Sequence, residues 1–360
     1  MTNVSRTRAL KATVFPALDG LRAVAALSVF VHHIYQQFSD QWTGPIFGAV
    51  MSHLGPWGVS MFFVLSGFCI HWARLMDADR GRRFQLKAFA TRRFFRIYPA
   101  FAVCVLLSFA LGRWHSSHLI EAASDSSVIA HLSLVSSFFV QHRVAVNNVL
   151  WSVVVECHFY VVYGLLWRYF DRPRNTAMLT GVAVLVSVLT YGASVTLVPQ
   201  GPTRVLLQST FLASWWTWCL GALVAEWIHH APPLLADGVR ANRVVLLVSF
   251  LLSLLIGLLP HPFDIHGRRF VLPVIAAVFL MCLLRDEHDY RWASPMLTLG
   301  TMSYSLYLFH PVAIWLGLQL MTGALPAVAV MLVTGLALTA LSYRFFEKPG
   351  MAMGKRLLAT

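Results

Sequence analysis

Two ionisable side chains, Arg22 and His33, stand eleven residues apart in the first apolar stretch of the chain. Eleven residues of α-helix rise about 16 Å and complete about three turns, so both side chains fall on nearly the same face. The neighbouring His32 is rotated by about 100°. An imidazole deep in a membrane can act as a general base. The same residues also fit structural roles, with His33 bonded to another helix and Arg22 anchoring its own helix at the membrane surface.

A carboxylate, Glu156, lies within a later apolar run that starts at about residue 149. Leaving it unpaired in hydrocarbon would cost several kcal/mol, so it needs a partner or a wet cavity. If the helix enters from the outer side, Glu156 lies about 10 Å down, at a depth similar to His33. We therefore predict a catalytic pair in which Glu156 fixes the tautomer of His33 and raises its basicity. A structural Glu–Arg or Glu–His pair between helices fits equally well.

Three arginines, Arg92, Arg93 and Arg96, precede the apolar run at about 97–112. Guanidinium groups bind phosphate through two parallel hydrogen bonds, and a helix N-terminus attracts phosphate by its dipole. The three residues are therefore a candidate phosphate site that opens a helix. Positive charge at the inner membrane surface would also anchor the helix without binding a ligand.

A later run is rich in hydroxyl groups and contains Ser303, Tyr304, Tyr307 and His310. Ser303, Tyr307 and His310 fall at helical spacing on one face, and Tyr304 lies on a flanking face. Such side chains can line a cavity and donate hydrogen bonds to a substrate oxygen. They can equally form hydrogen bonds between helices, and both roles stay open.

The elements that must position these residues are membrane-spanning helices. The 360 residues are 58% hydrophobic and 12% charged, against roughly 45–50% and about 25% in soluble proteins. This composition excludes a soluble globular domain and a disordered chain. Backbone groups in lipid must pair internally and the apolar runs lack strand alternation, so we predict an all-α, polytopic transmembrane helix bundle. About ten spans are expected, at about 20–38, 56–73, 97–112, 149–167, 176–198, 205–228, 244–259, 270–284, 297–320 and 326–343.

Basic residues indicate the orientation of these spans. With a cytoplasmic N-terminus, 22 of the 28 basic residues fall on the inner side, and five fall in outer loops: Arg113, Arg143, Arg204, Arg268 and Arg269. Basic residues concentrate on the cytoplasmic side of membrane proteins, so both termini are predicted to be cytoplasmic. This bias explains the net charge of +13 without a nucleic-acid partner. We expect one membrane domain over 1–360, with short tails at about 1–16 and 345–360.

Cysteine spacing and loop composition complete the prediction. The five cysteines show no spacing typical of a disulfide framework or a zinc site, so no metal is expected. A signal peptide would have a cleaner apolar stretch than the one that holds Arg22, so the first span is interpreted as retained. The segment Val128–Val140 looks amphipathic and is expected to lie along the outer interface.

Six stretches in a fixed order give the chain a family resemblance over about residues 15–350. They are Leu18–Arg22 through His33, Gly58–Phe68, Arg92–Pro99, Leu150–Tyr160, Ser303–Pro311 and Tyr343–Pro349. Together they resemble the membrane acyltransferase 3 family, the bacterial O-acyltransferases. The chain departs from the usual pattern at Ser60, where the family often has Asp, and at Cys157-His158, where a second acid or Gln is common.

The resemblance implies a multi-pass protein of the bacterial inner membrane that moves an acyl group, usually acetyl, from cytoplasmic acyl-CoA to a hydroxyl, commonly of a saccharide. It implies that Arg22 and His33 are the functional Arg–His pair of the family. Arg93 and Arg96 match its RxxR motif, and Glu156 matches its fourth-span carboxylate. Longer members add an extracytoplasmic esterase-like domain that these 360 residues do not show, which predicts a single-domain transferase.

The expected mechanism follows from these assignments. Arg93 and Arg96, with Arg92, would hold the CoA phosphates, and the pantetheine arm would run past Arg22 towards His33. His33 would then act as general base on the acceptor hydroxyl, with an acyl-histidine intermediate as the main alternative. Candidates for substrate or oxyanion contacts are Ser303, Tyr304, Tyr307 and His310.

Two other functions stay open beside saccharide modification. One is the same chemistry on a small secondary metabolite such as a macrolide. The other is a proton-coupled transporter, in which intramembrane His and Glu residues form a relay. Transporters of that kind have interrupted helices in two related halves, and the sequence shows no such repeat. The expected partners are the lipid bilayer and a hydroxyl-bearing acceptor, and the oligomeric state is left open.

Overall fold

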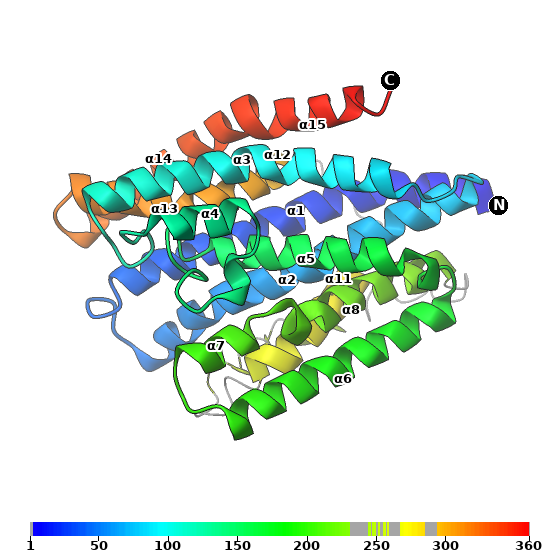
Figure 1. Cartoon of the computed structure of the whole chain (residues 1–360), viewed down its shortest axis with the longest axis horizontal. Coiled ribbons are helices and arrows are strands. Elements are labelled where there is room, and N and C mark those ends of the chain that lie inside the picture. The colour runs from blue at the N-terminus through cyan, green and yellow to red at the C-terminus, as the bar shows by residue number, and fades with distance from the viewer. Residues whose placement is uncertain are drawn as a thin grey trace. The chain divides into compact units, whose positions relative to one another are not determined.

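The structure is a computed structural model that describes residues 3–230, 267–284 and 294–359, with short pieces between 244 and 258. In these residues every regular element is a helix and none is a strand, which confirms the all-α prediction. The chain forms two compact units, which are described separately. The first comprises 1–75 and 220–304, and the second comprises 76–219 and 305–360. Figure 1 labels the helices along the chain.

Helices of the first unit pack closely because glycines stand at their crossing points. The elements are α1 (Asn3–Gln37), α2 (Pro45–Asp79), the π-helix η4 (Gly267–Val271), α11 (Leu272–Leu283) and α12 (Ser294–Thr301), with the last part of α8 (Phe211–His230). α1 and α2 run antiparallel, since His32 contacts Met51 whereas Arg22 contacts Cys69. At Gly58 a β-carbon would come within 2.6 Å of the Ala25 carbonyl oxygen.

α2 and α8 run in the same direction over their contact. Gly221 on α8 faces Val64, and further along Glu226 faces His71. A β-carbon at Gly221 would come 1.9 Å from the Val64 carbonyl oxygen, so only glycine permits this approach. The C-terminal part of α8 therefore lies beside the stretch of α2 around His71.

The second unit is built around α3 and α5. Its elements are α3 (Leu86–Trp114), α4 (Asp125–Leu132), η1 (Ser136–Phe138), α5 (Leu150–Leu166), η2 (Trp167–Tyr169), α6 (Pro173–Leu197), α7 (Pro202–Gln208), most of α13 (Ser303–Leu320), α14 (Ala324–Ser342), η6 (Tyr343–Glu347) and α15 (Lys348–Arg356). Residues 345–360, predicted as a short tail, belong largely to η6 and α15. α15 packs on α3, where a β-carbon at Gly350 would come 2.5 Å from the Phe95 carbonyl oxygen.

The segment between α3 and α5 packs into the second unit. Asn147, just before α5, donates a hydrogen bond of 3.1 Å to Ser108, well before α3 ends at Trp114. α4 lies against α3, where the Tyr98 hydroxyl donates to the Leu132 carbonyl at 3.1 Å. His158 of α5 donates to the Leu134 carbonyl at 2.8 Å. The segment predicted to lie along the outer interface is therefore tied to both helices, because its polar backbone finds partners there.

Seven of the described helices are long and apolar enough to cross a membrane, which supports a multi-pass membrane protein. They are Pro16–Gln37, Pro45–Asp79, Leu86–Trp114, Leu150–Tyr169, Pro173–Leu197, Pro202–His230 and Ala324–Arg356. Of the other predicted spans, 244–259 lies largely outside the described residues. The span at 270–284 contains α11, which has 12 residues. The one at 297–320 is divided at Met302 into α12 and α13. Ten spans and the sides of the termini stay predictions.

Candidate functional site

Arg22 is held between two helices of the first unit. Its Nη1 atom forms an ion pair of 2.5 Å with Asp19 on the preceding turn, and its Nη2 atom lies 2.9 Å from the Cys69 sulfur on α2. The arginine side chain is 21% exposed. The guanidinium group therefore has a fixed position beside α2, with part of its charge balanced by Asp19.

The two neighbouring histidines on α1 have different surroundings. His32 donates from Nδ1 to the Met51 carbonyl at 2.9 Å, and its ring fills the space over Gly55. His33 is half-buried, and its ring meets that of His32 edge-on at 5.1 Å between centroids. α1 is continuous from Arg22 to His33, so the predicted helical separation holds. The bond to α2 gives His32 a structural role, which favours His33 as the base.

Arg93 and Glu156 lie near each other in the second unit, with Tyr160 between them. The Tyr160 hydroxyl donates to Glu156 Oε1 at 2.5 Å, and the Arg93 guanidinium lies over the Tyr160 ring, 5.9 Å from its centroid. Phe89 meets the same ring edge-on at 6.3 Å. Sequence reasoning assigned no role to Tyr160, although its spacing of four from Glu156 places the two on one helix face.

The surroundings of Glu156 revise its predicted depth. That prediction assumed that α5 begins level with the outer end of its neighbours, but α5 begins beside Ser108, short of the end of α3. Glu156 lies at the level of Arg93, seven residues from the start of α3 at Leu86. His33 belongs to the first unit and Glu156 to the second, so their pairing stays a prediction.

The three arginines of α3 face different surroundings. Arg92 is exposed, Arg93 turns towards α5, and the Arg96 Nη1 atom lies 3.8 Å from the Met351 sulfur on α15. α3 begins at Leu86, so the arginines follow its first turn. The predicted contribution of the helix dipole is therefore wrong, because that effect is confined to the first turn. Phosphate binding would rest on the guanidinium groups alone.

The hydroxyl-rich residues of α13 are bonded within the protein. The Tyr307 hydroxyl lies 2.6 Å from Ser152 Oγ and 3.3 Å from the Val149 carbonyl oxygen. His310 is buried and donates from Nδ1 to the Tyr307 carbonyl at 2.8 Å. These contacts favour the helix-to-helix role for Tyr307 and His310. Ser303 is buried at the start of α13 and Tyr304 is half-buried, and their surroundings favour neither one as a donor to substrate.

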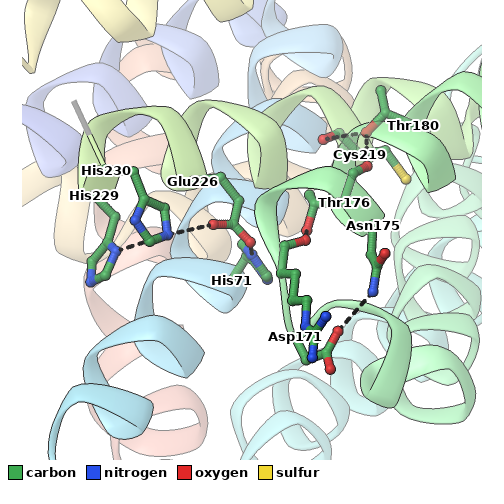
Figure 2. Close-up of polar contacts among 10 residues, drawn as sticks. His71, Asp171, Asn175, Thr176, Thr180, Cys219, Glu226, His229 and His230 are labelled. Atoms are coloured by element: carbon green, nitrogen blue, oxygen red, sulfur yellow. Dashed lines mark hydrogen bonds and ion pairs between the residues drawn. The ribbon is translucent and has the colours of Figure 1, made fainter. Parts of the chain in front are cut away.

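Sequence reasoning missed a second histidine–glutamate pair, in the first unit. Figure 2 shows Glu226 of α8 between two imidazoles. His71 Nε2 lies 2.8 Å from one carboxylate oxygen, and His230 Nε2 lies 3.2 Å from the other. Glu226 lies within a predicted span, so the argument applied to Glu156 would have identified it.

One histidine outside the candidate spans has a perturbed pKa. His131 of α4 is buried and donates from Nδ1 to the Ser127 carbonyl at 2.9 Å. The pKa of His131 is lowered to about 4, mainly by burial and in small part by the charge of nearby His142, against the opposing effect of the hydrogen bond to the Ser127 carbonyl. Across the part of the chain that the structure describes, no three His, Cys, Asp or Glu side chains are placed to hold a metal ion.

Comparison with known proteins gives a consistent result. Residues 15–344 match the family model described as an acyltransferase domain. The O-acetyltransferase OatA of Staphylococcus aureus is 26% identical over 93% of this chain and 57% of its own length. The peptidoglycan O-acetyltransferase OatA of Listeria monocytogenes is 25% identical over 96% of this chain, and the putative peptidoglycan O-acetyltransferase YrhL of Bacillus subtilis is 24% identical over 95%. The chain spans 57% and 55% of these two relatives. No solved structure matches the chain significantly.

Proposed function

The chain belongs to the membrane acyltransferase family whose domain model it matches over residues 15–344, and from this premise we propose that it is an O-acetyltransferase. The donor would be acetyl-CoA or another acyl-CoA, bound from the cytoplasm. The acceptor would be a hydroxyl of a saccharide, and the proposed location is the bacterial inner membrane. The observation that carries the proposal is the family match over nearly the whole chain.

The relatives favour a saccharide over a small metabolite, because two of them are named for peptidoglycan. A cell-wall saccharide, or its lipid-linked precursor, is therefore the acceptor that we propose. The geometry agrees with an acyltransferase, since a fixed Arg22 and a half-buried His33 share one continuous helix. We propose His33 as general base with Glu156 as its partner, and Arg93 and Arg96 as the phosphate contacts.

The test is acyl transfer by the purified full chain in lipid vesicles. Radiolabelled acetyl-CoA would be supplied on one side, and peptidoglycan fragments or lipid-linked disaccharide on the other. We expect label in an alkali-labile ester on the saccharide, and none without protein. Saccharide movement without acetyl-CoA, and no ester, would contradict the proposal and favour the transporter.

A matched pair of variants tests the role of the imidazole. His33→Ala should abolish ester formation while the protein stays folded in the membrane. His118→Ala removes an exposed imidazole from the segment after α3 and should leave the rate unchanged. Equal activity in both variants would refute His33 as the base.

A further inference from the structure

A buried carboxylate near the C-terminal end of α8 contacts two imidazoles, His71 of α2 and His230 of α8, in the first unit. His71 is fully buried, Glu226 is 2% exposed, and the side chain of His230 is 51% exposed. Figure 2 shows the three residues in line, with Glu226 in the middle. Exposure therefore rises from the protein interior to its surface, first across a hydrogen bond of 2.8 Å between His71 and Glu226 and then across an ion-pair contact of 3.2 Å between Glu226 and His230.

From this arrangement we propose that His71, Glu226 and His230 form a proton relay between the interior of the first unit and the aqueous phase. Each oxygen of the carboxylate has its own imidazole, at 2.8 and 3.2 Å. Imidazole gains and loses protons near neutral pH, and a carboxylate between two imidazoles can pass a proton from one to the other. Chains of His and Glu at membrane depth commonly carry protons.

Other ionisable groups stand on the two helices that carry the relay and on α1, which packs against α2. On the elements packed here they are Cys69 and Arg74 of α2, His229 of α8, and the Asp19–Arg22 pair of α1. His229 adjoins the relay, because its Nδ1 atom lies 3.4 Å from His230 Nε2, the same nitrogen that contacts Glu226, and its ring meets Trp72 edge-on. The control is therefore His118, an exposed imidazole of the second unit.

The reaction requires a proton to move, and this step rests on the proposed function. When acyl–S–CoA reacts with an acceptor R–OH, the carbon–sulfur bond breaks and a carbon–oxygen bond forms. The hydroxyl proton leaves oxygen and must reach the CoA sulfur, since a thiolate is basic at neutral pH. If acceptor and CoA meet from opposite sides of the membrane, one proton passes to the CoA side in each transfer. The predicted topology places the ends of α2 and α8 on that side.

The competing explanation is that the His71–Glu226 contact only holds α2 and α8 together, as a structural clamp with no role in proton transfer. An apolar pair of similar volume can replace a buried ion pair without loss of stability. The double variant His71→Leu with Glu226→Leu should therefore keep the clamp and lose the relay. Glu226→Gln removes only the charge, and His118→Ala is the control.

The experiment measures turnover and acetyl-CoA affinity of these variants from about pH 5.5 to 8.5, the range in which imidazole titrates. We expect Glu226→Gln and the double variant to lose at least tenfold in turnover, with affinity within twofold of the wild type. The pH dependence of turnover near neutrality should shift by at least one unit, and His118→Ala should stay within twofold of the wild type. If the folded double variant turns over at the wild-type rate, the pair is a clamp and the relay is refuted. Should Glu226→Gln fail to fold, the double variant decides.

Infrared spectroscopy separates failure of the relay from failure of the proposed function. The relay predicts a carboxyl band that titrates over the same pH range and is absent from Glu226→Gln. A wild-type protein without acyl transfer but with this band would refute the acyltransferase and keep the relay. Absence of the band from the wild type would refute the relay, whatever the activity.

Discussion

Tyr160 offers the sharpest test of the site in the second unit. Its hydroxyl donates to Glu156, and its ring lies beneath the Arg93 guanidinium. Tyr160→Phe removes the first contact and keeps the second. Tyr160→Leu removes both, so the two variants separate the roles of the carboxylate and the arginine.

The magnitudes follow from the two contacts. A hydrogen bond to a charged group contributes about 1.5–3 kcal/mol, and each 1.4 kcal/mol is about tenfold. If Glu156 must be oriented for transfer, Tyr160→Phe should lower turnover by about 10- to 150-fold. A cation–π contact contributes about 0.5–2 kcal/mol. Tyr160→Leu should therefore also weaken acetyl-CoA binding by about 2- to 30-fold if Arg93 binds phosphate.

The assay is turnover and acetyl-CoA affinity of purified protein in lipid. Tyr98→Phe is the matched control, since its hydroxyl donates to the neutral Leu132 carbonyl and its loss should lower the melting temperature but not turnover. Turnover of Tyr160→Phe within twofold of the wild type would refute the idea that this hydroxyl positions Glu156.

Three further predictions concern other parts of the molecule. Arg96→Ala should weaken acetyl-CoA binding with little change in turnover at saturation. Arg96→Lys should restore the affinity only partly, because an ammonium group cannot form the two parallel hydrogen bonds of a guanidinium. Unchanged affinity of Arg96→Ala in a titration with acetyl-CoA would show that Arg96 only anchors its helix. His131 has a lowered pKa, so its stabilising contribution is complete above about pH 6.5 and is lost as the pH falls towards about 4. At about pH 5 the free energy of unfolding is reduced by about 2 kcal/mol for this reason. His131→Phe should therefore make the melting temperature fall less between neutral pH and pH 5. An equal fall in the variant and the wild type would contradict the lowered pKa of His131. Gly221→Val should unfold the first unit or lower its melting temperature strongly, because a β-carbon there meets the Val64 carbonyl; a normal melting curve would contradict the close packing of α2 and α8.

Sequence patterns predicted the helical architecture because long apolar runs allow few alternatives in lipid. They did not predict features that depend on packing between helices, such as the depth of a residue and the point where a helix begins. The depth of Glu156 was counted from the end of its own run, but α5 begins beside Ser108, before α3 ends. Arg92, Arg93 and Arg96 were expected to open a helix, whereas α3 starts several residues earlier at Leu86. Helix boundaries depend on capping and tertiary contacts that apolar periodicity does not record.

The sequence also did not predict which side chains contact each other across helices. The pairing of His71 with Glu226 joins residues 155 positions apart, and one chain alone gives no signal for it. The separation of roles between His32 and His33 was predicted from helical geometry, because a rotation of about 100° must send the two rings to different neighbours. Cys69 beside Arg22 was missed, since a cysteine in an apolar run is usually a small core residue.

The proposed function requires that this chain transfers an acyl group from CoA and that His33 is the base. The most direct measurement is a single-turnover reaction of the wild type and His33→Ala with radiolabelled acetyl-CoA and a saccharide acceptor, with acetyl-CoA binding measured in the same samples. We expect equal acetyl-CoA binding in both proteins, ester formation by the wild type and none by the variant. Ester formation at the wild-type rate by His33→Ala would contradict it.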